Sequence, residues 1–151
     1  MSEIVAGLAV QLGDAAARLE LARIVAGRKR LGADGGFGEE IERVTIGLYQ
    51  LMRSRRTAIM VLDRCAGEFP DLAAVWYGDG RYALVDVWES YLELRAGHVT
   101  SGVDRAVLAR TIVEVLTTWA VKMPWDPAPR PYPDDMATAC AAMVRRLVGP
   151  N

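Results

Sequence analysis

Large aromatic rings and thioethers recur along this sequence on several segments that have helical periodicity. They are Tyr49, Met52, Met60, Trp76, Tyr77, Trp88, Tyr91, Trp119, Met123 and Trp125. Pockets for small apolar molecules are lined by such side chains with few polar groups, and methionine adapts its shape to varied ligands. The same residue types also fill solid cores. The pattern therefore leaves two hypotheses open, a pocket for a small hydrophobic molecule and a packed interior.

The residue types needed for catalysis are present but not grouped. The single histidine, His98, has no cluster of Cys, Asp or Glu around it at metal-ligand spacing. Ser101 lies nearby, but a nucleophile also needs an oriented base and an oxyanion site. The acidic pairs at residues 39–40 and 134–135 stand at predicted helix starts, where the helix dipole favours negative charge. We therefore expect no enzymatic activity, no cofactor and no metal site.

The composition is that of a globular protein. The chain has 151 residues, of which 52% are hydrophobic and 25% charged, and its formal net charge is -1. A near-neutral chain has no overall field that attracts nucleic acid or an anionic membrane. Cys65 and Cys140 lie far apart in apolar segments, as expected for reduced thiols rather than a disulfide framework. With no signal peptide and no apolar run of membrane-spanning length, we expect a cytoplasmic protein with no membrane partner.

Apolar residues recur every three to four positions through the sequence, which predicts an all-α fold. We expect one domain over residues 1–151, built as a bundle of about six to seven helices. Residues 1–30 are expected to hold one long helix, running from Glu3 to about Arg28. A glycine-rich connection at residues 31–38 follows it. The next helices, within residues 39–123, carry the predicted ligand-binding residues.

Cap and breaker residues predict where the helices begin and end. Pro70 suits the first turn of a helix, and Gly97 suits the end of one. The pair Gly78 and Gly80 predicts a kink or a break between them. Asp104 is the predicted N-cap of a hydrophobic helix that runs to about Met123. The last helix is expected to start near residues 134–135 and to stop at residues 149–150.

The last two helices, within residues 104–149, carry more apolar width than an isolated bundle requires. Their predicted dimer-interface residues are Leu108, Ile112, Val115, Met136, Cys140, Met143 and Leu147. Small alanines beside them would let another helix approach closely. Surplus apolar surface of this kind favours packing between two copies of a chain. The sequence therefore predicts a homodimer.

Residues 68–97 resemble the regulatory half of TetR-family transcriptional regulators. They begin EFPDLAAVWYGDGR and end YLELRAG, and that family has a Phe-Pro-Glu-Leu element and a later Tyr-Leu-x-x-Arg-x-x-Gly element at helix boundaries. The stretch from Asp104 to Trp119, the WDP sequence at residues 125–127 and the closing residues 143–150 are also similar to the family. The resemblance covers about residues 39–150, and its motifs are moderately specific because these regulatory halves vary widely.

The resemblance implies that the helices within residues 39–123 enclose an effector pocket. Its implied ligand-binding residues are Tyr49, Met52, Met60, Trp76, Trp88, Tyr91 and Trp119. It also implies that the helices within residues 104–149 form a four-helix dimer interface. The family's DNA-binding half has no counterpart in residues 1–30, so DNA is an expected partner only through a missing N-terminal domain. We expect a ligand-sensing, homodimerising regulatory domain. The alternative is a helical protein-interaction module without a ligand pocket, which a solid interior would favour.

Overall fold

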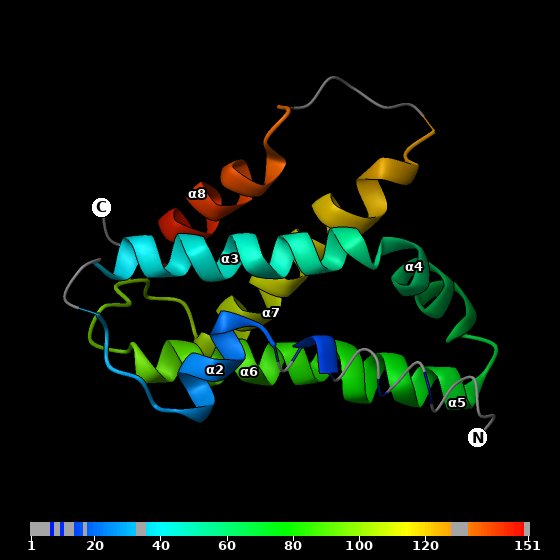
Figure 1. Ribbon diagram of the computed structural model, residues 1–151, viewed down its shortest axis with the longest axis horizontal. Coiled ribbons are helices and arrows are strands. Elements are labelled where there is room, and N and C mark those ends of the chain that lie inside the picture. Colours follow the sequence, from blue (N-terminus) through cyan, green and yellow to red (C-terminus); the bar gives the residue numbers. More distant parts are fainter. Residues whose placement is uncertain are drawn as a thin grey trace.

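The computed structural model describes residues 7, 10, 14–16, 18–32, 36–127 and 133–149. In these residues all regular structure is helical and no strand occurs, which confirms the predicted all-α bundle (Figure 1). The helices in chain order are α2 (Glu20–Ala26), α3 (Phe37–Ser54), α4 (Arg56–Cys65), α5 (Pro70–Ala73), η1 (Ala74–Tyr82), α6 (Ala83–Leu94), α7 (Arg105–Thr117), η2 (Thr118–Lys122), η3 (Met123–Trp125) and α8 (Met136–Val148).

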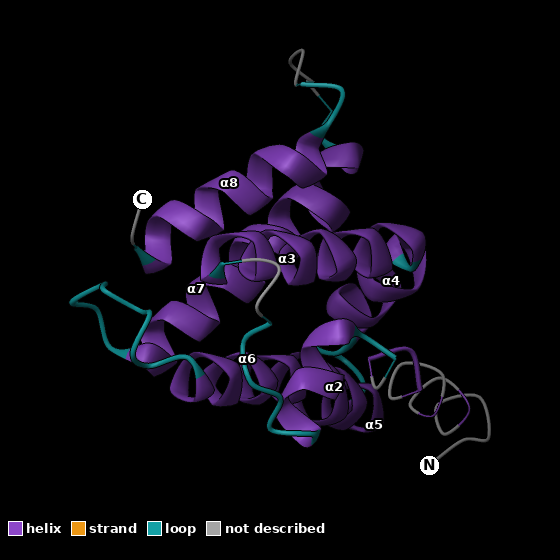
Figure 2. Cartoon of the chain, turned by 60° about the vertical axis from the view of Figure 1, so that its left-hand side comes forward, coloured by secondary structure: helices purple, strands orange, loops and turns teal. Residues whose placement is uncertain are grey.

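The bundle is organised around α3 and α6, which both run across the molecule (Figure 1). Buried side chains of both helices belong to the main core. Helix α8 packs most extensively on α3, while α7 packs against α6. Helix α2 lies against α6, so that α2 and α8 are at opposite ends of the stack (Figure 2). Amphipathic periodicity explains this order, because each helix buries one stripe against its neighbour. On α3 the stripe includes Ile41, Val44 and Leu48.

Residues from Pro70 to Leu94 form one continuous helical rod of changing geometry. Pro70 occupies its first turn, as predicted. Gly78 and Gly80 do not break the rod, and the predicted kink is instead a π-helical section, η1, between α5 and α6. Glycine weakens α-helical preference, which lowers the free-energy cost of departing from α geometry. The rod ends at Leu94, three residues before the predicted end at Gly97.

The caps of the last two long helices follow the predictions. The Asp104 carboxylate accepts hydrogen bonds from the amides of Ala106 and Val107 at the start of α7. Asp135 caps α8 in the same way through the amide of Thr138. At the other end of α8, Gly149 has φ of 70°, in the left-handed region that favours glycine.

The N-terminal helix differs from its prediction. Of the helix expected from Glu3 to Arg28, the structure describes residues 7, 10, 14–16 and 18–28, and these do not form one helix. Leu19 has extended backbone with ψ of 141°, and α2 begins only at Glu20. Arg28 has φ of 45°, which ends the helical segment. The packing of α2 against α6 decides this, since Leu21 is completely buried in the core.

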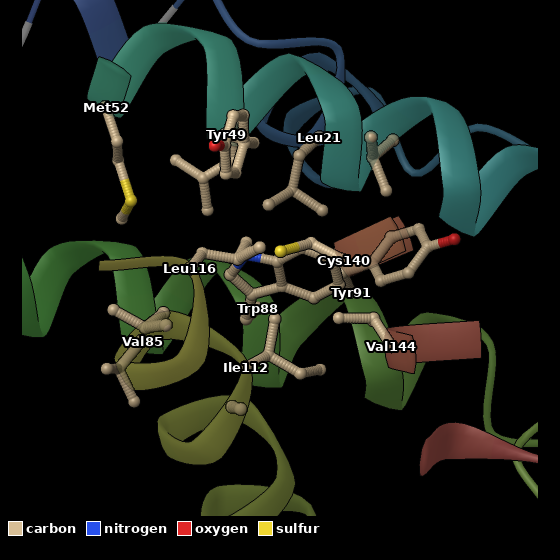
Figure 3. Close-up of a cluster of buried hydrophobic side chains, with 14 of the residues drawn as sticks. Leu21, Tyr49, Met52, Val85, Trp88, Tyr91, Ile112, Leu116, Cys140 and Val144 are labelled. Carbon is tan, nitrogen blue, oxygen red and sulfur yellow. The ribbon is translucent and has the colours of Figure 1, made fainter. Parts of the chain in front are cut away.

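The centre of the core holds two rings from α6. Trp88 and Tyr91 meet edge to face with their centroids 5.6 Å apart. Figure 3 shows them between α3 and α7, with Ile112 and Leu116 among their neighbours. All four side chains are fully buried. This layer of large rings fills the space between α3 and α6, the two long helices of the bundle.

Candidate functional site

An apolar inner cavity of about 50 Å³ lies beside the core, next to η1. Its lining residues come from six parts of the chain: Ala15 and Ala16 before α2, Leu48, Leu51 and Met52 on α3, Arg55 and Ile59 at the start of α4, Trp76 and Gly80 on η1, Leu84 on α6, and Thr117 on α7. Most of these side chains are apolar. The inner cavity is therefore suited to an uncharged molecule with little polar surface.

Polar contacts hold the η1 wall of the inner cavity in place. The Trp76 indole donates from Nε1 to Asp63 Oδ1 on α4 at 3.0 Å. At the other end of η1, Arg81 donates from Nε to Glu114 Oε1 on α7 at 2.9 Å, and its second guanidinium nitrogen also pairs with that carboxylate. A bidentate pair fixes both distance and orientation. The Trp76 ring is thereby presented to the inner cavity as a rigid surface.

Thr117 contributes a hydroxyl to the opposite wall. Its Oγ1 donates to the carbonyl oxygen of Val113 at 2.7 Å and lies 3.9 Å from Met52 Sδ. The hydroxyl hydrogen is thus engaged within α7. Among the wall residues, Met52 has the most adaptable side chain, since an unbranched thioether can change rotamer without losing much packing.

A second hollow, the outer cleft, opens on the surface where α3, η2 and the start of α8 meet. Its volume is about 270 Å³, and it is lined by Tyr49, Arg53, Trp119, Ala120, Met123, Pro124, Pro133, Asp134 and Met136. Burial raises the pKa of the Tyr49 phenol above 10.0, with a smaller contribution from Cys140. The outer cleft is more polar than the inner cavity, because Arg53 and Asp134 stand at its edge.

The seven predicted ligand-binding residues are divided among different environments. Met52 and Trp76 line the inner cavity, whereas Tyr49 and Trp119 line the outer cleft. Trp88 and Tyr91 belong to the solid core, and Met60 is partly buried against it without lining either hollow. The structure therefore does not bring all seven residues to one pocket.

The predicted dimer-interface residues also divide into two groups. Leu108, Ile112 and Cys140 are covered by the chain's own helices and present no surface to a second copy, so they are core residues. Met143 is 42% exposed. Val115, Met136 and Leu147 are half-buried. The wide apolar face of each helix led to a wrong interface prediction for these three residues, because α7 and α8 turn them toward the chain's own helices.

A buried charged network links α3, α6 and the connection before α3. Arg95 donates from Nε to Glu40 Oε1 at 2.7 Å and from Nη2 to Oε2 at 3.0 Å. Its Nη1 donates to the carbonyl oxygen of Lys29 at 2.9 Å, and the Tyr91 hydroxyl donates to Glu40 Oε1 at 2.9 Å. Only 4% of the Arg95 side chain and 7% of the Glu40 side chain are exposed.

The pKa values of this network reflect its partners. Burial raises the pKa of Glu40, but hydrogen bonds from Arg95 and Tyr91 outweigh it and leave the pKa below the ordinary 4.5. Burial and the neighbouring Glu40 carboxylate raise the pKa of Tyr91. The hydrogen bonds to Glu40 raise the pKa of Arg95. Glu40 and Arg95 are therefore both charged at neutral pH, and they act as a structural connection.

This network corrects the interpretation of Glu40 as an acid explained by its helix start alone. The spacing of Glu40 and Arg95 from buried residues on their helices could have indicated the network. Glu40 lies three residues after Phe37 and four before Val44, both of which are buried on α3. Arg95 follows Tyr91 by four residues on the buried side of α6. A charge at a core position of one helix therefore predicts an opposite charge at a core position of another.

The other candidates for chemistry are His98 and the side-chain types that bind metals. In the described part of the chain, no group of three or more His, Cys, Asp and Glu side chains is placed to hold a metal ion. His98 is exposed, and its ring stacks on Phe37 with a centroid distance of 5.7 Å. None of the helices in the described residues has both the length and the apolar character needed to cross a membrane.

Comparisons with protein-family models, with curated proteins and with solved structures gave no match.

Proposed function

We propose that this chain is the ligand-sensing and self-associating part of a TetR-like transcriptional regulator. In this proposal a small hydrophobic molecule binds in the inner cavity and no covalent step takes place. The observation that carries the proposal is the apolar space between η1 and α3, with the Trp76 ring as one of its walls. The proposal places the protein in the cytoplasm, where its free thiols would remain reduced.

The composition of the cavity wall supports a sensing role. Ala15 and Ala16 precede α2 and line the inner cavity together with residues of α3 and α7. A molecule that enters this space makes contact with the N-terminal segment and with the bundle at once. A ligand shifts a conformational equilibrium when it interacts differently with two states. We therefore propose that occupancy of the cavity changes how the N-terminal segment packs.

Occupancy can be tested with a probe that fits the present volume. Xenon binds apolar protein cavities, so two-dimensional ¹H–¹⁵N NMR spectra under xenon pressure should show a shift of the Trp76 indole resonance. Leu84→Phe places a ring in the inner cavity and should abolish this shift. Leu94→Phe on the same helix is the matched control, since Leu94 lines a different, open groove, and it should respond like the native chain. Absence of any xenon response in the native chain would remove the ligand-sensing proposal.

Self-association is supported by exposed apolar side chains on the two last long helices. Val107 at the start of α7 is 54% exposed, and Met143 on α8 also faces outward. Apolar side chains left exposed to water favour association between copies. Sedimentation equilibrium at micromolar concentration should give the mass of a dimer. Met143→Glu should shift it to monomer, while Val61→Glu, at another exposed apolar position, on α4, should not. A native monomer would contradict the proposal.

A second proposal is a helical protein-interaction module with no ligand. The observation in its favour is the size of the inner cavity, since about 50 Å³ is well below the several hundred Å³ typical of pockets for drug-sized ligands. This alternative predicts dimerisation without any xenon response. The two measurements together therefore distinguish the proposals.

A further inference from the structure

The outer cleft contains a polar group whose hydrogen bonding is incomplete. Tyr49 lines the cleft from α3, and only 4% of the residue is exposed. Within the described residues, burial and nearby charges act on its phenol but no hydrogen bond does. Trp88 Nε1 is the one fully enclosed side-chain nitrogen or oxygen without a partner in that part of the chain. The unpartnered Tyr49 oxygen must therefore reach accessible surface, and the outer cleft is the hollow that Tyr49 lines.

The Tyr49 hydroxyl is thus available to a molecule in the outer cleft. Burial raises the pKa of the phenol above 10.0, so the hydroxyl keeps its proton at neutral pH and can donate it. Polar groups in such buried positions are normally paired, because leaving one unpaired costs free energy. The group that would complete this bond is an oxygen acceptor on a bound molecule.

A cation lies beside this hydroxyl. Arg53 follows Tyr49 by four residues on α3 and lines the same cleft, and positions four apart are neighbours on one face of a helix. Arg43, on the same helix, is paired with Glu20, whereas Arg53 has no ion pair with any described residue. Hydrogen bonds to ionised oxygens are the strong ones, and guanidinium matches the geometry of a carboxylate. A phenol donor next to an unpaired guanidinium is therefore suited to a carboxylate.

The acidic residues near the cleft stand farther from the phenol. Among the groups that are charged at neutral pH, Arg53 has the largest effect on the pKa of Tyr49, and Asp135 has a smaller one. Asp135 is engaged as the cap of α8. Asp134 lines the cleft beside it, at the start of α8, where the positive end of the helix dipole offsets negative charge. The cleft therefore has a positive end at Tyr49 and a negative end at Asp134.

The rest of the cleft wall is mainly apolar. Trp119 on η2, Met123 and Met136 line it, and each is half-buried. An indole offers a flat face on which an aromatic ring can stack, and thioether sulfurs make favourable contacts with ring edges. The cleft volume of about 270 Å³ is just below the range of about 300–1,000 Å³ for ligand pockets, which suits a compact molecule.

We propose that the outer cleft is a second binding site, which takes a small aromatic carboxylate. The carboxylate accepts a hydrogen bond from Tyr49 Oη and pairs with the Arg53 guanidinium, while the ring lies against Trp119. The outer cleft and the inner cavity have no lining residue in common. The inference therefore goes beyond the proposed ligand-sensing function and does not depend on it.

Three probes with the same ring system test the inference: 2-naphthoate, the neutral 2-naphthamide and the cationic 2-naphthylmethylammonium. In ¹H–¹⁵N spectra, 2-naphthoate should move the Trp119 indole resonance, which is assigned by its loss in Trp119→Phe, and should leave the Trp76 resonance in place. Its dissociation constant should be about tenfold lower than that of 2-naphthamide, as expected for one hydrogen bond to a charged group. The ammonium compound should bind no better than the amide.

Substitutions at the two polar positions give a second measurement. Arg53→Gln removes the cation and should abolish the preference for 2-naphthoate over 2-naphthamide. Arg56→Gln, at an exposed arginine on α4 that lines neither hollow, is the matched control and should keep the native preference. Tyr49→Phe keeps the ring without the hydroxyl and should weaken 2-naphthoate binding by about tenfold. Circular dichroism checks that each variant is folded.

The possible results separate this inference from the ligand-sensing function. The inference is overturned if no probe moves Trp119, or if the ammonium compound binds more tightly than 2-naphthoate, because Asp134 would then dominate the cleft. An unchanged preference for 2-naphthoate in Arg53→Gln would also contradict it. The ligand-sensing function is tested by the xenon response of Trp76 in the inner cavity, so either proposal can fail while the other stands.

Discussion

Removing the positive charge from the buried network should be among the most destabilising single substitutions in this chain. Arg95→Met keeps the length of the side chain but leaves the Glu40 carboxylate buried with the Tyr91 hydroxyl as its remaining partner. It also releases the carbonyl of Lys29. Breaking one side of a buried ion pair costs about 3–5 kcal/mol. For a domain of this size, that corresponds to a fall in melting temperature of roughly 10 °C.

The loss of stability in Arg95→Met should depend on pH, and the pKa of Glu40 determines the direction of that dependence. In the native chain the pKa of Glu40 in the folded state is below 4.5, so its ionised form stabilises the fold above that pH. This contribution is lost as the pH falls through the folded-state pKa. In Arg95→Met, burial without the guanidinium should raise the pKa of Glu40 above its unfolded value. The free-energy cost of burying this unpaired carboxylate is then present at pH 7 and disappears as the pH falls below about 4. The difference in the free energy of unfolding between native and variant chains therefore narrows as the pH falls.

Urea unfolding followed by tryptophan fluorescence and circular dichroism, at intervals from pH 7 to pH 4, measures this gap. Glu40→Gln and the double variant Glu40→Gln/Arg95→Met complete a double-mutant cycle. The double variant should lose about 2 kcal/mol less than the sum of the two single losses, because neither buried charge is then left without its partner. A loss below about 1 kcal/mol for Arg95→Met at pH 7, or one that stays constant with pH, would refute the reasoning.

Three further predictions concern local features of the fold. Gly149→Ala should destabilise the chain by about 1–2 kcal/mol in thermal melts, because L residues disfavour the left-handed region. Its Cβ would also clash with Thr100 Oγ1. Gly97→Ala, where a Cβ meets nothing within 4 Å, should melt closer to the native temperature, and an equal loss would contradict the argument. Asp104→Ala should cost about 1 kcal/mol by removing the α7 cap, while Asp104→Ser should retain most of it, as measured by urea unfolding. Native-state alkylation followed by mass spectrometry should modify the partly exposed Cys65 before Cys140, whose pKa is raised by burial; equal labelling of both thiols would show that α8 opens readily.

Part of the candidate site could be predicted from residue type. Met52 and Trp76 were expected to bind a ligand, and both line the inner cavity. Trp88 and Tyr91 have the same chemical character but fill the core. Residue type specifies how apolar a side chain is, whereas the neighbouring helices determine whether it meets another side chain or an empty space. The predicted ligand site therefore contains the correct kinds of residue but combines two hollows with the core.

The buried charged network is a feature that local sequence patterns did not predict. Glu40 was interpreted from its place at a helix start, although its spacing from Phe37 and Val44 puts it on the buried stripe. Its partner, Arg95, is 55 residues away along the chain. Local patterns describe one helix at a time, so they cannot match a buried charge on α3 with one at the end of α6.

The sequence by itself determined that the chain is helical and where several of its helices begin. Periodicity and capping act over three or four residues, so Asp104, Asp135 and Pro70 could be placed without a structure. Only the tertiary structure decided that the N-terminal helix is interrupted at Leu19, that η1 is continuous through its glycines, and that Trp88 keeps an unpaired N–H. These features depend on the packing of helices that are distant in sequence, and that packing outweighs local preference wherever a side chain is buried.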